Sequence, residues 1–171
     1  FKIKNEVEKV KNYLDGDIFN LTKVMPILSI TKEYNHRTLI ENFLYNRNAA
    51  PLLEFLQKEK EYMGFLYMTT EELLLNLKLN YLSKESIITK NTSYKKFNDS
   101  IFENTKEYFK KDNGFMHPYQ IFLKFKNIDI FRSEFIEKKL EELLQAEYSI
   151  KNGTLDDEIA VETLILNFFT D

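Results

Sequence analysis

The sequence predicts an all-α fold, a helical bundle. Apolar residues recur at three- and four-residue spacing along most of the chain, and no segment alternates convincingly between apolar and polar residues as a strand would. Glycine and proline also occur where helices are expected to begin or end. With 171 residues, 43% hydrophobic and 30% charged, the chain can form one domain with a substantial core, or one domain plus part of another.

Net charge and composition exclude several classes of protein. The formal charge of −3 gives no global basic field, so any contact with nucleic acid must be a local patch. The absence of cysteine excludes disulfides and thiolate chemistry. No apolar run approaches the roughly 18 residues that would span a bilayer, and we expect a cytoplasmic protein without a membrane partner. The first residues, Phe1-Lys2-Ile3-Lys4, neither begin with methionine nor resemble a signal peptide. We therefore expect the chain to be a fragment of a longer protein.

Helices are predicted in order along the first two thirds of the chain. The spacing indicates helices over residues 2–14, from about residue 20 to Pro26, over 34–45 and from Asn48 through Leu56, with 29–33 as a linker. A longer helix, with Gly64 within it or beside it, reaches Leu82, and a loop follows over 83–93. A helix over 94–109 is predicted to bury Phe97, Ile101, Phe102, Tyr108 and Phe109. After Asn113-Gly114, which stops it, His117-Pro118 opens a short helix that extends through Phe125.

The last third, residues 132–169, is predicted to form two helices joined at Lys151-Asn152-Gly153. Ser133 is the expected cap of the first helix, Gly153 its left-handed end and Thr154 the cap of the second. The expected inner stripe of the first helix is Phe135, Ile136, Leu140, Leu143, Leu144 and Tyr148, with Lys139 among the charged residues opposite. The second helix is apolar nearly all round, so neighbours in this chain or in another must cover it.

Motifs for cofactor or metal chemistry are missing from the sequence. The four glycines are too dispersed for a phosphate-binding loop, and His36 and His117 lack partners at zinc-ligand spacing. The paired acids Glu71-Glu72, Glu141-Glu142 and Asp156-Asp157 are interpreted as solvated helix faces, because adjacent residues diverge on a helix. We therefore expect no catalytic residue, no cofactor and no metal.

Two turns have both a structural and a functional interpretation. His117-Pro118-Tyr119 is either a helix cap with a packed aromatic residue or a functional loop. Lys151, in the last turn of its helix, either complements the helix dipole or faces a partner or a phosphate at the end of the bundle.

Several motifs resemble, in order and spacing, those of the bacterial DNA polymerase III delta subunit, a part of the clamp loader. Residues 146–156, AEYSIKNGTLD, resemble the near-terminal ADxxLKTGxxD signature, and 114–119, GFMHPY, look like GxHPF. Near the beginning, 5–10, NEVEKV, are similar to NELEKL of the small lid domain, and 18–24 resemble the ITxEDV segment that follows it. The chain departs from these patterns at Glu147, Asn152 and Lys23.

The resemblance implies that residues 1–31 are the last helices of an AAA+-like lid domain and that 32–171 are the C-terminal collar domain. A collar domain is not catalytic: it packs against the ATPase and delta-prime subunits, and the chain would be part of a DNA-directed DNA polymerase only by association. The resemblance also implies that the sliding clamp is contacted through a domain that precedes Phe1, and that primed DNA is contacted in the full complex. The residues expected at the interface between subunits are His117, Pro118, Tyr119, Leu164, Phe168 and Phe169, and Lys151 is expected to face DNA.

Two other interpretations of the residues remain open. A general all-α adaptor unrelated to replication would be a monomer that binds partner peptides in an apolar cleft. An all-α enzyme would need a deep pocket that holds at least two carboxylates.

Overall fold

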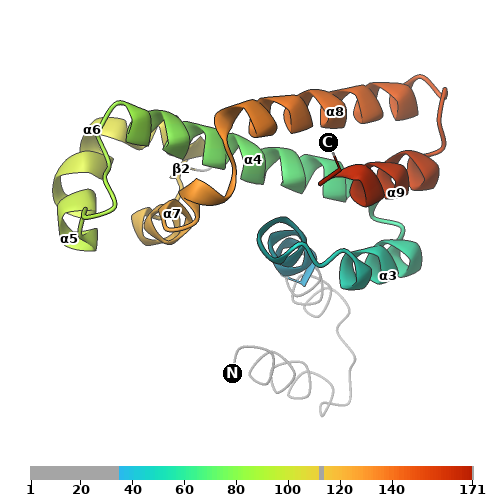
Figure 1. The fold of residues 1–171 in the computed structure, drawn as a ribbon, viewed down its shortest axis with the longest axis horizontal. Coiled ribbons are helices and arrows are strands. Elements are labelled where there is room, and N and C mark those ends of the chain that lie inside the picture. Colours follow the sequence, from blue (N-terminus) through green and yellow to red (C-terminus); the bar gives the residue numbers. More distant parts are fainter. Residues whose placement is uncertain (1–34, 112–113, 171) are drawn as a thin grey trace, which may run out of the picture. The chain divides into compact units, whose positions relative to one another are not determined.

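The computed structural model describes residues 35–111 and 114–170, and the helices and linker predicted before residue 34 lie outside them, as does Asn113. The chain divides into two compact units, Phe1–Glu59 and Lys60–Asp171. In the described residues nearly all regular structure is helical (Figure 1), which confirms the predicted all-α fold. The predicted domain boundary between residues 31 and 32 stays a prediction.

The described part of the first unit consists of two helices. Residues 35–46 form the first, and α3 spans Ala50–Glu59 with Pro51 in its first turn, where the missing amide costs no hydrogen bond. Arg47 links them with a positive φ of 55°. The His36 and Phe55 rings lie 4.8 Å apart, and the buried apolar residues repeat at helical spacing: Ile40, Phe43, Leu44, Leu52 and Leu56.

The second unit is organised around α4, Tyr62–Lys84, which contains Gly64 as predicted (Figure 1). Helices α8, Ser133–Lys151, and α9, Asp157–Asn167, both pack on α4. Helix α7, Pro118–Phe125, and the 3-10 turn Ile128–Ile130 also contact α4. The leucines from Leu73 to Leu79 are mainly core residues, although Leu74 is exposed.

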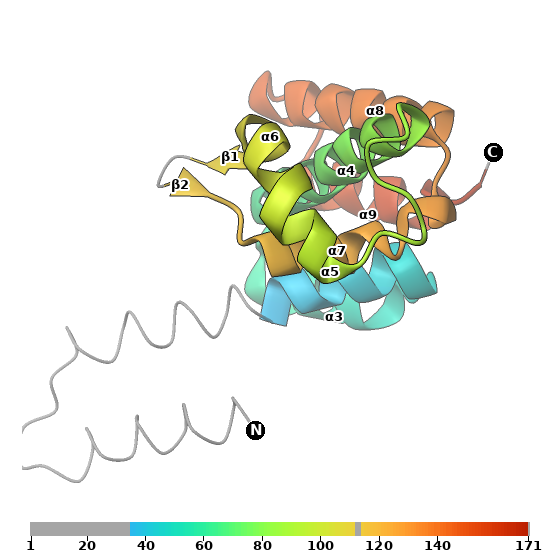
Figure 2. The ribbon, with the colours of Figure 1, turned by 90° about the vertical axis from the view of Figure 1, so that its left-hand side faces the viewer.

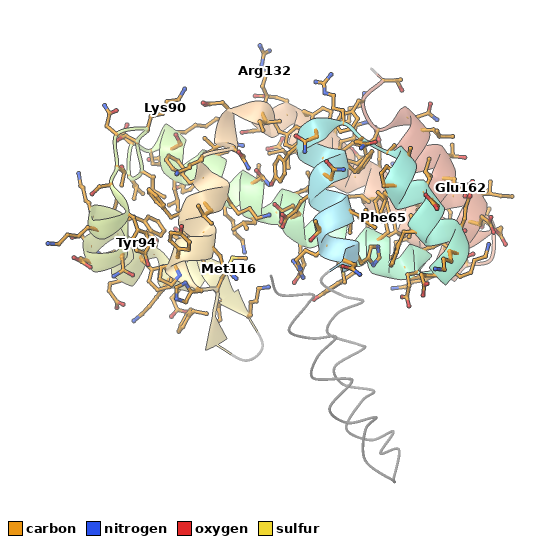
Figure 3. The ribbon with its side chains drawn as sticks, turned by 90° about the horizontal axis from the view of Figure 1, so that it is seen from below. Phe65, Lys90, Tyr94, Met116, Arg132 and Glu162 are labelled. Carbon is orange, nitrogen blue, oxygen red and sulfur yellow. The ribbon has the colours of Figure 1, made fainter. Side chains whose placement is uncertain are left out.

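The C-terminal half of α4 shares one apolar core with the segment that follows it. This core contains Leu79 and Leu82 of α4, together with Phe97, Phe109, Ile121 and other apolar residues. Tyr94, Met116 and Phe122 are partly buried and pack against it. Figure 3 labels Tyr94 and Met116.

The predicted helix over residues 94–109 is present but irregular. It runs as α5, Tyr94–Lys96, a π-helix, Phe97–Phe102, then α6, Glu103–Thr105, and a 3-10 helix, Lys106–Phe109. The wider π turn allows Phe97, Ile101 and Phe102 to be buried together. The tighter 3-10 turn leaves Phe109 inside but Tyr108 47% exposed, so the predicted burial of Tyr108 is wrong.

A short hairpin corrects the expectation that no strand occurs. Strand β1, Lys110–Lys111, pairs antiparallel with β2, Gly114–Phe115, beside α6 (Figure 2). Two residues per strand are too few to produce a detectable alternation in the sequence.

The ends of α8 and α9 differ in part from the prediction. Gly153 has a φ of +69° just after α8, and the Thr154 amide donates back to the Ser149 carbonyl, as in the predicted left-handed end. Ser133 is the first helical residue and not the cap, which is Arg132. Asp156, rather than Thr154, caps α9, because its carboxylate accepts from the amides of Glu158 and Ile159.

Candidate protein-interaction surface

The inner face of α8 is centred on a buried lysine. Lys139 is only 2% exposed, although the sequence placed it among the solvated charges. Its ammonium lies 5.6 Å from the centroid of the Phe135 ring and 5.3 Å from that of Phe168. It also donates to Glu142 at 2.8 Å. Two ring faces and one carboxylate thus replace the water that a lysine loses on burial.

This arrangement rotates the buried stripe of α8 away from the predicted one. Ser133, Ile136, Lys139 and Leu143 are buried, whereas Leu144 is 64% and Tyr148 71% exposed. The predicted burial of Leu144 and Tyr148 is therefore wrong. They are four residues apart and lie on one face of the helix.

Apolar side chains are exposed on α9 and on the loop before it as well. Ile159 is 61%, Leu166 66% and Leu155 46% exposed. We define the α8/α9 surface by these three residues together with Leu144 and Tyr148. Exposed apolar residues on two helices that pack against each other make this surface a candidate protein interface.

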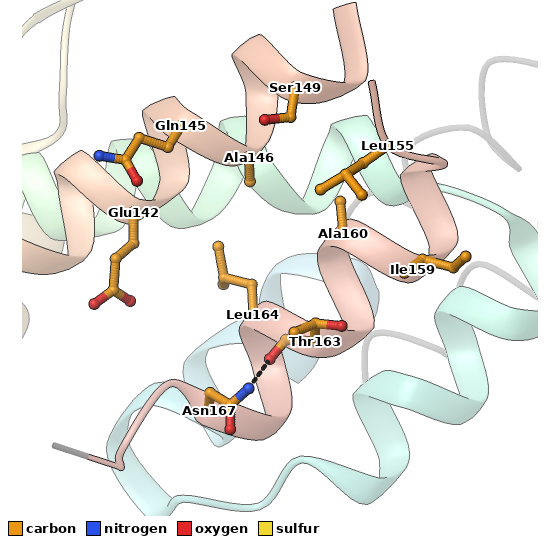
Figure 4. A pocket seen from close by; sticks show the side chains of 10 residues that line it. All are labelled: Glu142, Gln145, Ala146, Ser149, Leu155, Ile159, Ala160, Thr163, Leu164 and Asn167. Atoms are coloured by element: carbon orange, nitrogen blue, oxygen red, sulfur yellow. Dashed lines mark hydrogen bonds between the residues drawn. The ribbon is translucent and has the colours of Figure 1, made fainter. Parts of the chain in front are cut away.

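A groove between α8 and α9 adjoins this surface (Figure 4). Its volume is about 430 Å³, and Leu155 and Ile159 line it beside the small residues Ala146 and Ala160. Polar groups are contributed by Glu142, Gln145, Ser149, Thr163 and Asn167. Glu142 is the only carboxylate among the lining residues and pairs with Lys139, so the groove lacks the two convergent acids that an acid–base enzyme would need.

The residues predicted for an interface in the last helix lie mainly inside the unit. Leu164 and Phe168 are buried, and Phe169 is half-buried. Phe168 lies edge-to-face against Phe135 and Phe169, with ring centroids 6.0 and 5.1 Å apart. The exposed large apolar residues of α9 are instead Ile159 and Leu166. The expectation that Leu164, Phe168 and Phe169 contribute to an interface between subunits stays a prediction.

His117, Pro118 and Tyr119 form the start of α7. His117 is exposed, and its Nδ1 accepts a hydrogen bond of 3.2 Å from the Tyr119 amide, so the imidazole caps the helix as the structural interpretation predicted. Pro118 occupies the first helical position. Tyr119 is 48% exposed and packs edge-on against Tyr94, with ring centroids 5.2 Å apart.

Lys151 is exposed at the end of α8 and forms an ion pair with Glu147 one turn earlier. Its position at the negative end of the helix dipole is the one predicted. Because the side chain is 66% exposed, the pair leaves Lys151 accessible to other groups.

One predicted solvated acid is buried. Glu72 on α4 is 4% exposed and pairs with Lys124 of α7 at 2.6 Å, so the interpretation of Glu71-Glu72 as a solvated face is wrong for Glu72. The pair joins α4 to the helix that carries the His117 turn.

A second ionic contact joins α9 to the residues just before α4. Lys60 donates to Glu158 at 2.8 Å and lies 3.5 Å from the Tyr62 hydroxyl. The hydrogen bond to Glu158 raises the pKa of Lys60 above its ordinary value. Burial raises the pKa of the Tyr62 phenol, because the charged phenolate would lose its hydration.

Within residues 35–111 and 114–170 no group of three or more histidine or acidic residues is placed to hold a metal ion. In the same part of the chain no helix has the length and apolar character that crossing a membrane requires.

Comparison with protein families gives one match. The family model for the C-terminal domain of the DNA polymerase III delta subunit matches residues 46–168. The matched range contains the His117 turn and the whole α8/α9 surface. Searches of curated proteins and of solved structures found no significant match.

Proposed function

Because this chain belongs to the family of C-terminal domains of the DNA polymerase III delta subunit, we propose that it is the collar domain of a clamp-loader delta subunit. Its role is assembly: it holds the delta subunit in place by burying helix faces against neighbouring loader subunits, of the ATPase and delta-prime types. Through them it helps to load the sliding clamp on primed DNA. In this proposal the chain itself carries out no chemical step.

The observation that carries the proposal is the α8/α9 surface. Leu144, Tyr148 and Ile159 are each more than half exposed, on two helices that pack against each other. Covering such side chains is favourable by about 25 cal/mol per Å² of apolar area. A stable protein interface buries about 800 Å² on each partner, so the α8/α9 surface would form one part of such an interface.

The experiment measures binding of this chain to purified ATPase and delta-prime subunits. We expect Leu144→Ala/Tyr148→Ala to weaken complex formation at least tenfold, since large exposed aromatic and aliphatic residues dominate interface energetics. The matched control is Tyr81→Ala on α4, which removes a tyrosine that is 51% exposed outside the α8/α9 surface. It should leave the affinity unchanged.

Two results would refute the proposal. The first is a chain that binds none of the loader subunits, as the adaptor interpretation expects. The second is an affinity that the Leu144/Tyr148 variant and the Tyr81 control change equally. Circular dichroism checks that both variants remain folded, which is expected because all three side chains are exposed.

A further inference from the structure

A second exposed stripe of mainly apolar residues runs along one face of α4, apart from the α8/α9 surface. Its exposed residues, with their exposed fractions, are Met63 at 37%, Tyr67 at 63%, Leu74 at 41% and Tyr81 at 51%. Thr70 and Leu77 lie between them and are half-buried. We define the α4 seam by all of these residues together. In an α-helix they lie within about 80° of one another around the axis, over a length of about 27 Å.

The spacing of the α4 seam is that of a coiled-coil contact. Its residues follow one another at alternating intervals of four and three residues from Met63 to Tyr81. Buried residues of α4, such as Phe65, Glu72 and Asn76, lie on the opposite side of the helix. Because α8, α9 and α7 already pack on α4, a second helix that binds the seam orders no new backbone in α4, which lowers the free-energy cost of association.

Two opposite charges flank the α4 seam on one side. Glu71 and Lys78 each directly follow a seam residue, so both occupy the heptad position that meets a partner helix at the edge of the contact. The Tyr67 hydroxyl donates to the Glu71 carboxylate at 3.2 Å, which holds this carboxylate beside the seam, and Lys78 is exposed. The equivalent positions on the other flank carry no charge, since they are Leu66, Leu73 and Asn80.

We propose that the α4 seam packs against the α4 seam of a second copy of this chain, antiparallel and about a two-fold axis. In an antiparallel pair the charged flanks of the two helices meet, whereas in a parallel pair each meets the uncharged flank of the other. When Leu74 of one copy packs on Leu77 of the other, Glu71 of each copy faces Lys78 of the other, as two-fold symmetry requires. A shift of one heptad in either direction brings two Glu71 or two Lys78 side chains together, so the charges select this register. The contact goes beyond the assembly role, since it leaves the α8/α9 surface open.

Sedimentation equilibrium of the intact chain at several concentrations gives the dissociation constant of the dimer. Leu74→Ala should raise this constant at least about tenfold, because it removes an apolar contact from the centre of the seam in both copies. Lys78→Glu and Glu71→Lys should each raise it about tenfold, since each brings like charges together twice in the dimer. An equimolar mixture of these two charge variants should instead form a heterodimer, because both charge pairs are then attractive again.

The matched control is Leu144→Ala/Tyr148→Ala, which removes exposed apolar side chains outside the α4 seam and should leave the dissociation constant unchanged. The proposal is overturned if the chain is monomeric at every concentration, or if the control raises the constant as much as Leu74→Ala does. It is also overturned if the mixed charge variants form no heterodimer. A third refuting result is that Leu74→Ala weakens binding to a loader subunit and not self-association, which would assign the seam to that subunit. Circular dichroism checks that the variants remain folded, as expected from the exposure of Leu74.

Discussion

The buried ion pair between Glu72 and Lys124 should contribute strongly to stability. The two side chains are 4% and 16% exposed, and their charged atoms are 2.6 Å apart. Lys124→Met keeps the length of the aliphatic stem but removes the ammonium, so the Glu72 carboxylate stays buried without this counter-charge. Removing one partner of a buried pair costs about 3–5 kcal/mol of unfolding free energy.

Urea denaturation at pH 7, followed by circular dichroism, measures this loss. In a chain of this size a change of about 3 kcal/mol corresponds to a fall of about 10 °C in the melting temperature. The double variant Glu72→Leu/Lys124→Met should recover most of the stability, because it removes the carboxylate and the ammonium of this pair together. The control is Lys151→Met in the exposed pair with Glu147, which should change stability by less than about 0.5 kcal/mol.

The reasoning would be wrong if Lys124→Met cost no more than the control at Lys151. It would also be wrong if the double variant were as unstable as Lys124→Met alone. The latter result would show that the aliphatic and hydrogen-bonding contacts of the two side chains, and not their charges, hold α7 on α4.

Three further predictions concern the ends of α8 and α9 and the alkaline limit of stability. Gly153→Ala should lower the free energy of unfolding by about 1 kcal/mol in a urea titration, because alanine is strained at a φ of +69°. The added Cβ itself would meet no neighbouring atom within 4 Å. Asp156→Ala should cost about 1 kcal/mol by the same measurement and Thr154→Ala less than about 0.5, because only Asp156 caps α9. The pKa values of Lys60 and Tyr62 are both raised, so the folded chain holds these protons more tightly than the unfolded chain. The two protonated side chains therefore stabilise the fold fully below about pH 10, and this stabilisation is lost as the pH rises through the folded pKa values. Tyr62→Phe should make the free energy of unfolding fall less between about pH 8 and pH 12 in a series of urea denaturations.

The sequence predicted well those features that depend on local backbone chemistry. His117-Pro118 begins α7 and Gly153 follows the end of α8, because capping and left-handed geometry restrict which residues fit at these positions. The family resemblance is confirmed by the match over residues 46–168, since ordered motifs combine several such restrictions.

Features that depend on tertiary packing were not predictable in the same way. Lys139 and Glu72 are charged residues in helices, and the sequence pattern cannot show that two aromatic rings or a lysine 52 residues away will solvate them. The exposure of Tyr108 depends on a π turn and a 3-10 turn within one helical segment, and these change the angular position of every later residue.

The burial of Lys139 also explains which apolar side chains of the last two helices are exposed. Leu164 and Phe168, which the sequence analysis expected at an interface between subunits, are buried within the unit. Since Lys139 lies between Phe135 and Phe168, that side of the helix pair is filled by the chain itself. Leu144 and Tyr148, which the sequence pattern placed on the inner stripe, are exposed on the outer face of α8 as a result.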